Sequence, residues 1–161
     1  MPIYVATCAA VAVTAAQDVF ELVTHATSRV RVKEIRLGQY TDFGDAAAEM
    51  LSVLVIRGNA TSGSGGSTAT PVNLSPLSGA LAAVTVVEIN NTTVASTGSP
   101  VTLVADAWNI QRGWLWRARC KEEEIEVGVS SRLVVRITAP ADSITLNGTI
   151  VFEESGKSAT A

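Results

Sequence analysis

The sequence predicts an all-β protein: an antiparallel β-sandwich or jelly roll with an extended N-terminal arm and one long Gly/Ser-rich loop. Three observations lead to this fold class. Short runs alternate apolar and polar residues, clusters of polar turn residues separate the runs, and almost no stretch has the period of a helix. A strand pair with one apolar face must be covered by a second sheet, so we expect two packed sheets.

The length of 161 residues fits one domain with a single substantial core. We expect the sandwich to span residues 17–154, preceded by an arm or edge strand at 1–16 and followed by a tail at 155–161. The net charge is −3 with scattered cations, which argues against nucleic-acid binding. No run reaches the 18 or so apolar residues of a membrane-spanning helix, so no membrane partner is expected.

The proportion of charged residues is low, at 17% against about 25% in ordinary soluble domains. Few charges leave a large apolar surface for one domain to expose, and self-association would cover it. The N-terminal apolar segment has no preceding Lys or Arg, so we expect no cleaved signal and synthesis in a cytoplasm. Cys8 and Cys120 are then expected to be free thiols.

Residues 3–16 are mostly Ala, Val and Thr, and their pattern fits an extended arm or a buried edge strand equally well. Residues 17–24 fit a short helix, because Thr14 and Gln17 have capping-box spacing, or a strand, because Phe20 and Leu22 alternate with polar neighbours. We favour the strand, since residues 24–28 form a polar loop that leads directly into the next one.

Residues 28–38 predict a strand with Val30 and Val32 on one face. The alternation slips at Lys33 and Glu34, which indicates a β-bulge. Residues 40–45 have turn composition, and residues 45–50 fit one helical turn. Residues 51–57 are almost wholly apolar, which is typical of a strand buried on both faces or at a subunit contact.

Residues 58–68 are rich in Gly and Ser and predict a flexible loop, because Gly63, Gly65 and Gly66 have no side chains to anchor it. A phosphate-binding loop would need a following Gly-Lys-Ser/Thr or a helix after the glycines, and the sequence offers neither. We therefore expect a mobile loop without a ligand.

Further strands are predicted at 82–90, 101–107, 114–116 and 125–129, with a polar turn after the first and clustered charges at 117–126. The last part, residues 131–154, gives the strongest signal. Leu133 and Ile137 share a face with Val135, Pro140 lies in a turn, and alternation then runs unbroken through Gly148. This favours one long strand over a hairpin at residues 147–148, and we expect the two strands to form an antiparallel pair.

No catalytic, cofactor or metal site is predicted. His25 is the only histidine and lies near Ser28 without the geometry of a nucleophile and base, so we expect a loop histidine with ordinary hydrogen bonds. The acidic run at 122–126 lacks the spacing of a calcium loop. A solvated turn, or salt bridges to a neighbouring subunit's arginines, explains it better.

Trp114 and Trp116 are expected on the same face of one strand. Beside Arg112 and Arg117 they could stack a sugar or bind a protein partner, whereas packing in the core or between subunits is the simpler interpretation.

Several segments together resemble a family of small proteins of tailed bacteriophages and prophages, the capsid decoration (cement) proteins. The segments are residues 31–39, 44–51 leading into 61–67, 132–136 and 148–154. The resemblance implies a jelly roll, sometimes similar to the tumour-necrosis-factor fold, that binds the outer capsid shell as a homotrimer. The implied partners are the major capsid protein and further copies of the chain, and the implied location is the virion surface.

Under this interpretation the arm at 1–16 adds to a neighbour's sheet edge or lies along the major capsid protein, so its deletion would abolish shell binding and leave trimers intact. The trimer would bury residues 51–56. A competing hypothesis is a carbohydrate-binding jelly roll of a phage tail or fibre, with the two tryptophans as its platform. The candidate partner-binding residues are Ile3, Tyr4, Val5, Val11, Val13, Trp114 and Trp116.

Overall fold

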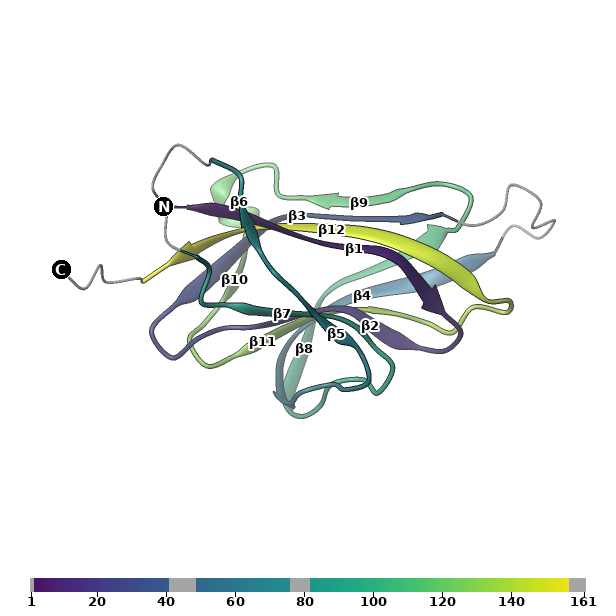
Figure 1. The fold of residues 1–161 in the computed structure, drawn as a ribbon, viewed down its shortest axis with the longest axis horizontal. Helices are drawn as coiled ribbons and strands as arrows, with labels where there is room; N and C mark the ends of the chain where they lie inside the picture. Colours follow the sequence, from purple (N-terminus) through teal and green to yellow (C-terminus); the bar gives the residue numbers. More distant parts are fainter. Residues whose placement is uncertain (1, 41–48, 76–81, 157–161) are drawn as a thin grey trace.

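The computed structural model describes residues 2–40, 49–75 and 82–156. They form two antiparallel sheets that pack face to face (Figure 1), which confirms the predicted all-β sandwich. The apolar faces of both sheets point inward and form one core, because each strand can bury only the alternate side chains that face its partner sheet.

The first sheet has the order β10-β3-β12-β1-β6, and β9 also pairs with β3. A short 3-10 helix, η2 (Lys121–Glu123), precedes β10. The strands are β1 (Ile3–Val13), β3 (Arg29–Gln39), β6 (Val72–Asn73), β9 (Trp114–Arg117), β10 (Ile125–Val127) and β12 (Ile144–Ser155).

The second sheet has the order β5-β7-β2-β11-β4-β8, which leaves β5 and β8 at its two edges. Its longest strand, β8, has 14 residues and pairs along most of β4. The strands are β2 (Gln17–Val23), β4 (Met50–Thr61), β5 (Ser67–Ala69), β7 (Val86–Asn91), β8 (Ser96–Asn109) and β11 (Arg132–Ile137).

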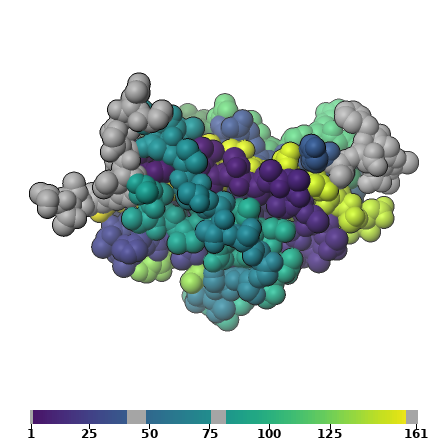
Figure 2. Space-filling view, viewed as in Figure 1, coloured from purple at the N-terminus to yellow at the C-terminus, as the bar shows by residue number. Residues whose placement is uncertain are grey.

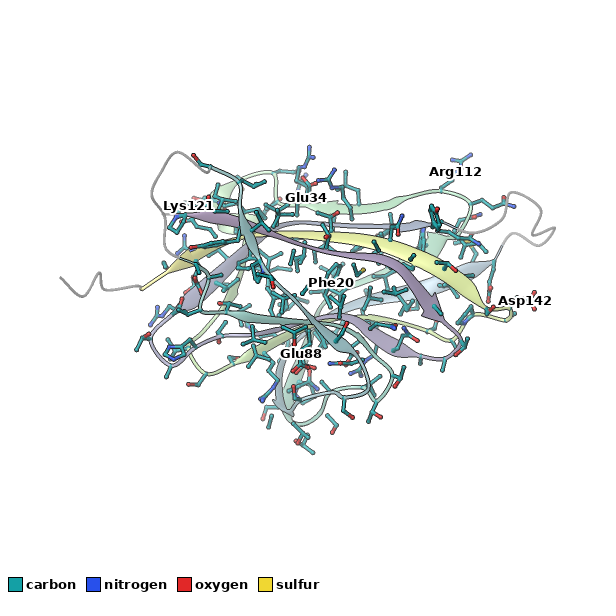
Figure 3. The ribbon with its side chains drawn as sticks, in the orientation of Figure 1. Phe20, Glu34, Glu88, Arg112, Lys121 and Asp142 are labelled. Carbon is teal, nitrogen blue, oxygen red and sulfur yellow. The ribbon has the colours of Figure 1, made fainter. Side chains whose placement is uncertain are left out.

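Strand β12 confirms the prediction of one long strand through Gly148. Its residues are alternately buried and half-exposed over most of its length, as a strand with one face in the core requires. Phe20 lies between the sheets (Figure 3), and a Cβ atom added at Gly148 would lie 2.8 Å from a ring carbon of Phe20 and 2.9 Å from Cys8 Sγ. Only glycine leaves room for this close contact.

The predicted antiparallel pairing of the strands in residues 131–154 is wrong. Strand β11 pairs with β2 and β4 in the second sheet, whereas β12 pairs with β1 and β3 in the first. The turn around Pro140 carries the chain from one sheet to the other. The two apolar faces therefore cover each other across the core, which removes the exposed face that a hairpin would have left.

The N-terminal segment is a strand of the first sheet and not a free arm. Strand β1 pairs with β12 from Ile3 opposite Glu153 to Val13 opposite Ile144, and β6 pairs with it only at Tyr4 and Val5. Figure 2 shows this purple segment packed along the body of the molecule and not extending away from it. The alternative of a buried edge strand describes it better, because its alternate apolar side chains complete the core.

Two local predictions are confirmed, and one falls partly outside the described residues. Residues 17–23 form strand β2. The pairing of β3 with β12 steps from Glu34 to Val32, so Lys33 is the extra residue of the predicted bulge. The turn and helical turn predicted at 40–50 fall largely on residues 41–48, which lie outside the described part.

The Gly/Ser-rich segment is better anchored than predicted. Its beginning belongs to β4 and its end to β5, and Ser64 exchanges backbone hydrogen bonds with Thr93 at 2.9 Å. The glycines permit close packing: a Cβ atom at Gly63 would lie 2.6 Å from the carbonyl oxygen of Thr93. Backbone hydrogen bonds anchor this segment. The prediction of a mobile loop considered only its side chains, so it missed these bonds.

Candidate interaction surface

Strand β8 presents an unusually long free edge. Among the residues that the structure describes, it pairs only with β4, so the backbone groups along its other side have no strand partner. Asp106 is the single charged side chain in its 14 residues, and most of its side chains are exposed. Long, nearly neutral edges are templates for pairing with another chain.

A groove of about 670 Å³ lies beside Leu103 of this strand. Leu103 of β8 and Ile125 of β10 provide its apolar side chains. The groove is therefore lined by the edge strands of both sheets. Its charged lining is balanced, with the cations Arg31, Arg57 and Lys121 and the carboxylates Glu122, Glu124 and Glu126.

Ion pairs hold much of this lining in place. Arg31 pairs with Glu126 at 3.3 Å, and Arg57 donates a hydrogen bond to the backbone oxygen of Glu126 at 2.7 Å. Glu124 pairs with Lys33 at 2.5 Å, which helps to raise the pKa of Lys33 against the opposing effect of its burial. Glu123, Glu124 and Glu126 of the acidic run thus pair with cations of the same chain, which leaves them no need of a neighbouring subunit's arginines.

The one charge on β8 is tied to the first sheet. Trp114 Nε1 donates a hydrogen bond to Asp106 Oδ2 at 2.9 Å. This bond lowers the pKa of Asp106, and a hydrogen bond from the backbone N–H of Ala107 lowers it further by a smaller amount. The Asp106 carboxylate therefore links β8 of the second sheet to β9 of the first.

Two buried carboxylates, Asp18 and Glu154, fix loops over the sheets, a role that the sequence did not predict for them. Asp18 binds the guanidinium of Arg136, with 2.6 Å from Nε to Oδ1, and accepts a hydrogen bond from Ala95 N at 2.6 Å. Glu154 accepts hydrogen bonds from the backbone N–H and the hydroxyl of Thr85 at 2.7 and 2.6 Å. Buried charges need such partners, so these residues act in the fold.

Glu21 has the same role for the Gly/Ser-rich segment. Its carboxylate accepts hydrogen bonds from Ser62 Oγ at 2.6 Å and from Gly63 N at 2.9 Å, and pairs with Arg132 at 3.2 Å. Glu88 lies directly opposite Glu21 on β7, and Asn91 Nδ2 donates to both carboxylates. Figure 3 places Glu88 on the outer side of the second sheet.

The N-terminal candidates divide between the core and the surface. Tyr4 and Val13 are buried, and the Tyr4 ring packs against Phe152 with 5.8 Å between centroids. These two side chains cannot contact a partner while β1 stays in its sheet. Ile3 and Val5 are half-buried on the other face, whereas Val11 is half-buried on the core face, because a bulge between Cys8 and Val11 shifts the register. Residues 1–16 are therefore not a separable arm, and deleting them would remove part of the core.

The tryptophan candidates lie together on β9, and both pack inward. Trp114 is only 6% exposed, and Trp116 packs against the core from a half-buried position. Their backbones pair with Leu37 and Ile35 of β3. The simpler interpretation of core packing is therefore the better one, and no flat aromatic platform faces solvent here.

The remaining sequence candidates occupy ordinary positions. His25 is exposed and shares a hydrogen bond with Thr27 Oγ1 at 2.9 Å, as expected of a loop histidine. Leu51, Val53 and Val55 lie in this chain's own core and not at a subunit contact. Across the described ranges there is no group of three or more metal-ligating side chains, and no helix long and apolar enough to span a membrane.

Comparisons with protein-family models, with curated proteins and with solved structures find no match to this chain.

Proposed function

We propose that the protein is a structural component of a bacteriophage virion, a capsid decoration or cement protein that binds the outer shell as a homotrimer. The major capsid protein is its proposed partner, and the protein is proposed to be made in the host cytoplasm before it joins the virion surface. In this role the chain needs a stable fold and surfaces for association, but no catalytic centre.

The observation that carries this proposal is the free edge of β8. Its 14 residues include one charged side chain, and Val101 and Leu103 are 52% and 36% exposed. Monomeric proteins commonly shield such edges with charges or cover them. An edge of this length, in a chain with only 17% charged residues, supports a role that depends on association.

Stabilisation of the shell would follow from multivalency. A trimer that touches several capsomers converts each further contact into an intramolecular event, so weak contacts act at a high effective concentration. Three-fold symmetry of the protein would match local three-fold positions of a shell.

The test is to mix the purified full-length protein with undecorated capsids of a phage that carries its gene, and to sediment the capsids. We expect saturable binding that ends at a fixed number of copies per capsid, and a higher melting temperature of the decorated shells. A matched control is the same protein after heat unfolding, which should not co-sediment specifically. The absence of saturable binding to the native protein would refute the proposal.

The carbohydrate-binding alternative has less support, because it depends on Trp114 and Trp116 as a stacking platform. The burial of Trp114 and the inward packing of Trp116 leave little aromatic surface for a sugar ring.

A further inference from the structure

Asn147 and Gly148 form the only Asn-Gly pair of the sequence, and both residues have a place in the fold. Gly148 is buried in β12, where a Cβ atom would crowd the core. Asn147 is exposed, and its Oδ1 accepts a hydrogen bond from the backbone N–H of Ala10 at 2.7 Å. This bond holds the bulge of β1, at which the pairing with β12 steps from Cys8 to Val11.

An Asn-Gly pair is chemically labile, because glycine has no side chain to hinder attack of its nitrogen on the neighbouring amide. The backbone nitrogen of Gly148 would form a bond to Cγ of Asn147 while the bond from Cγ to Nδ2 breaks. Nδ2 leaves as ammonia and takes the proton of the Gly148 N–H. Water then opens the cyclic imide at either carbonyl, which gives aspartate or isoaspartate without any redox change.

The paired strand opposes the first step of this reaction. Strand β12 lies between β1 and β3, with Gly148 opposite Cys8 on one side and Leu37 on the other, so its backbone is held extended. Side chains stand roughly perpendicular to an extended strand, which keeps Cγ of Asn147 out of line with the following nitrogen. Ring closure therefore requires β12 to lose its pairing on at least one side.

Of the two neighbours, β1 is the one that opens more easily. Its bulge interrupts the pairing with β12, and Ala10 has a φ of 52°, which is unfavourable for a residue with a side chain. Strand β6 pairs with the far edge of β1 only at Tyr4 and Val5, whereas β9 and β10 both pair with the far edge of β3. We propose that Asn147 is a site of spontaneous deamidation, and that the opening of β1 from β12 sets its rate.

Deamidation would change β12 permanently. Isoaspartate carries the main chain through Cβ and Cγ, so the strand gains one backbone carbon and the residues beyond it shift against both neighbours. Aspartate leaves the backbone intact, keeps an oxygen to accept the bond from Ala10 and adds one negative charge. The isoaspartate product would therefore lose the pairing of β1 with β12, and the aspartate product would keep it.

The first test incubates the full-length protein at pH 8 in buffer and in denaturing urea, and follows the peptide that contains Asn147 by mass spectrometry. We expect deamidation to be at least about tenfold faster in urea, because the strand pairing that blocks ring closure is lost there. Equal rates in buffer and urea would overturn the inference, and so would an Asn147 that stays intact in urea.

Two valine variants locate the opening. Val13→Ala shortens a buried side chain of β1 that lies opposite Ile144 of β12. The matched control is Val53→Ala, which shortens an equally buried side chain of β4 in the other sheet. We expect Val13→Ala to accelerate deamidation in buffer about tenfold more than Val53→Ala does. Equal acceleration would show that deamidation follows global unfolding, which overturns the role of β1.

Hydrogen exchange of the wild-type protein tests the same opening without any variant, so the inference stays testable if Val13→Ala does not fold. Amides of β1 that pair with β12 should exchange faster than amides of β3 that pair with β12. Exchange that is equal in the two strands, or slower in β1, would overturn the assignment of the opening to β1.

Discussion

The indole Nε1 of Trp114 donates a hydrogen bond to the carboxylate of Asp106 at 2.9 Å, and this bond joins the edge strand β8 of one sheet to β9 of the other. It also lowers the pKa of Asp106, together with a backbone bond from Ala107. The same contact thus ties the two sheets together and fixes the only charge on β8.

Replacing Trp114 by Phe removes this bond and keeps an aromatic ring. We expect the lost bond to cost about 1 kcal/mol of unfolding free energy at pH 7, since its acceptor is exposed and the bond is weakened by solvent; the smaller ring adds a packing cost that does not depend on pH. The lowered pKa means that the charged form is favoured in the folded state. Its stabilisation is present above the unfolded pKa and is lost as the pH falls through the folded pKa.

Urea unfolding of wild type and Trp114→Phe at pH 7, 5 and 3 measures this effect. The difference between the two proteins should be constant from pH 7 to 5 and smaller at pH 3. In an Asp106→Asn background the pH-dependent part should vanish. A difference that stays equal at pH 3 and pH 7 would contradict a role for the carboxylate.

Glu21→Gln tests the anchoring of the Gly/Ser-rich segment. The variant leaves Arg132 without its buried counter-charge and weakens the bonds from Ser62 and Gly63, so we expect about 2 kcal/mol of destabilisation. The matched control is Glu88→Gln, which removes the like charge opposite Glu21 and should change stability much less. Chemical denaturation measures both; equal losses would refute the assignment of Glu21 as the anchor.

Gly148→Ala tests the close packing of β12 on the second sheet. The added methyl group would press on Phe20 and Cys8, so we expect about 1–3 kcal/mol of destabilisation. Gly38→Ala on the neighbouring strand is the control, because a Cβ atom there has no neighbour within 4 Å. Thermal and chemical unfolding should separate the two variants clearly, and similar stabilities would contradict the packing at Gly148.

The two cysteines should differ in reactivity. Burial raises the pKa of Cys8 to about 12, whereas Cys120 is exposed. Because the thiolate is the reactive species, iodoacetamide at pH 8 should modify Cys120 in the native protein and both cysteines after denaturation. Mass spectrometry of the digested peptides measures the extent of alkylation at each cysteine. Rapid native modification of Cys8 would show that β1 is not held in the sheet.

The sequence predicted the sandwich and most strands correctly because side-chain alternation is a local signal. Strand β12, the bulge at Lys33 and the strand at residues 17–23 all follow from it. Pairing is not local. Residues 131–137 and 144–154 look like a hairpin in sequence, yet the turn between them changes sheets, and only the competition between all the strands decides this.

The interaction surface was harder to predict for the same reason. Alternation located a strand at 101–107 but could not place it at an edge of the sheet. The burial of Tyr4, Val13 and Trp114 depends on partners far away in the sequence. One usable signal was present: residues 96–109 contain a single charge, which is typical of a surface that associates.

The solution mass of the full-length protein, measured by light scattering at several concentrations, tests directly whether the chain associates with copies of itself. We expect a mass near three chains, because the proposed decoration role requires a homotrimer. A mass of one chain at every concentration would contradict self-association, and with it the role proposed for β8.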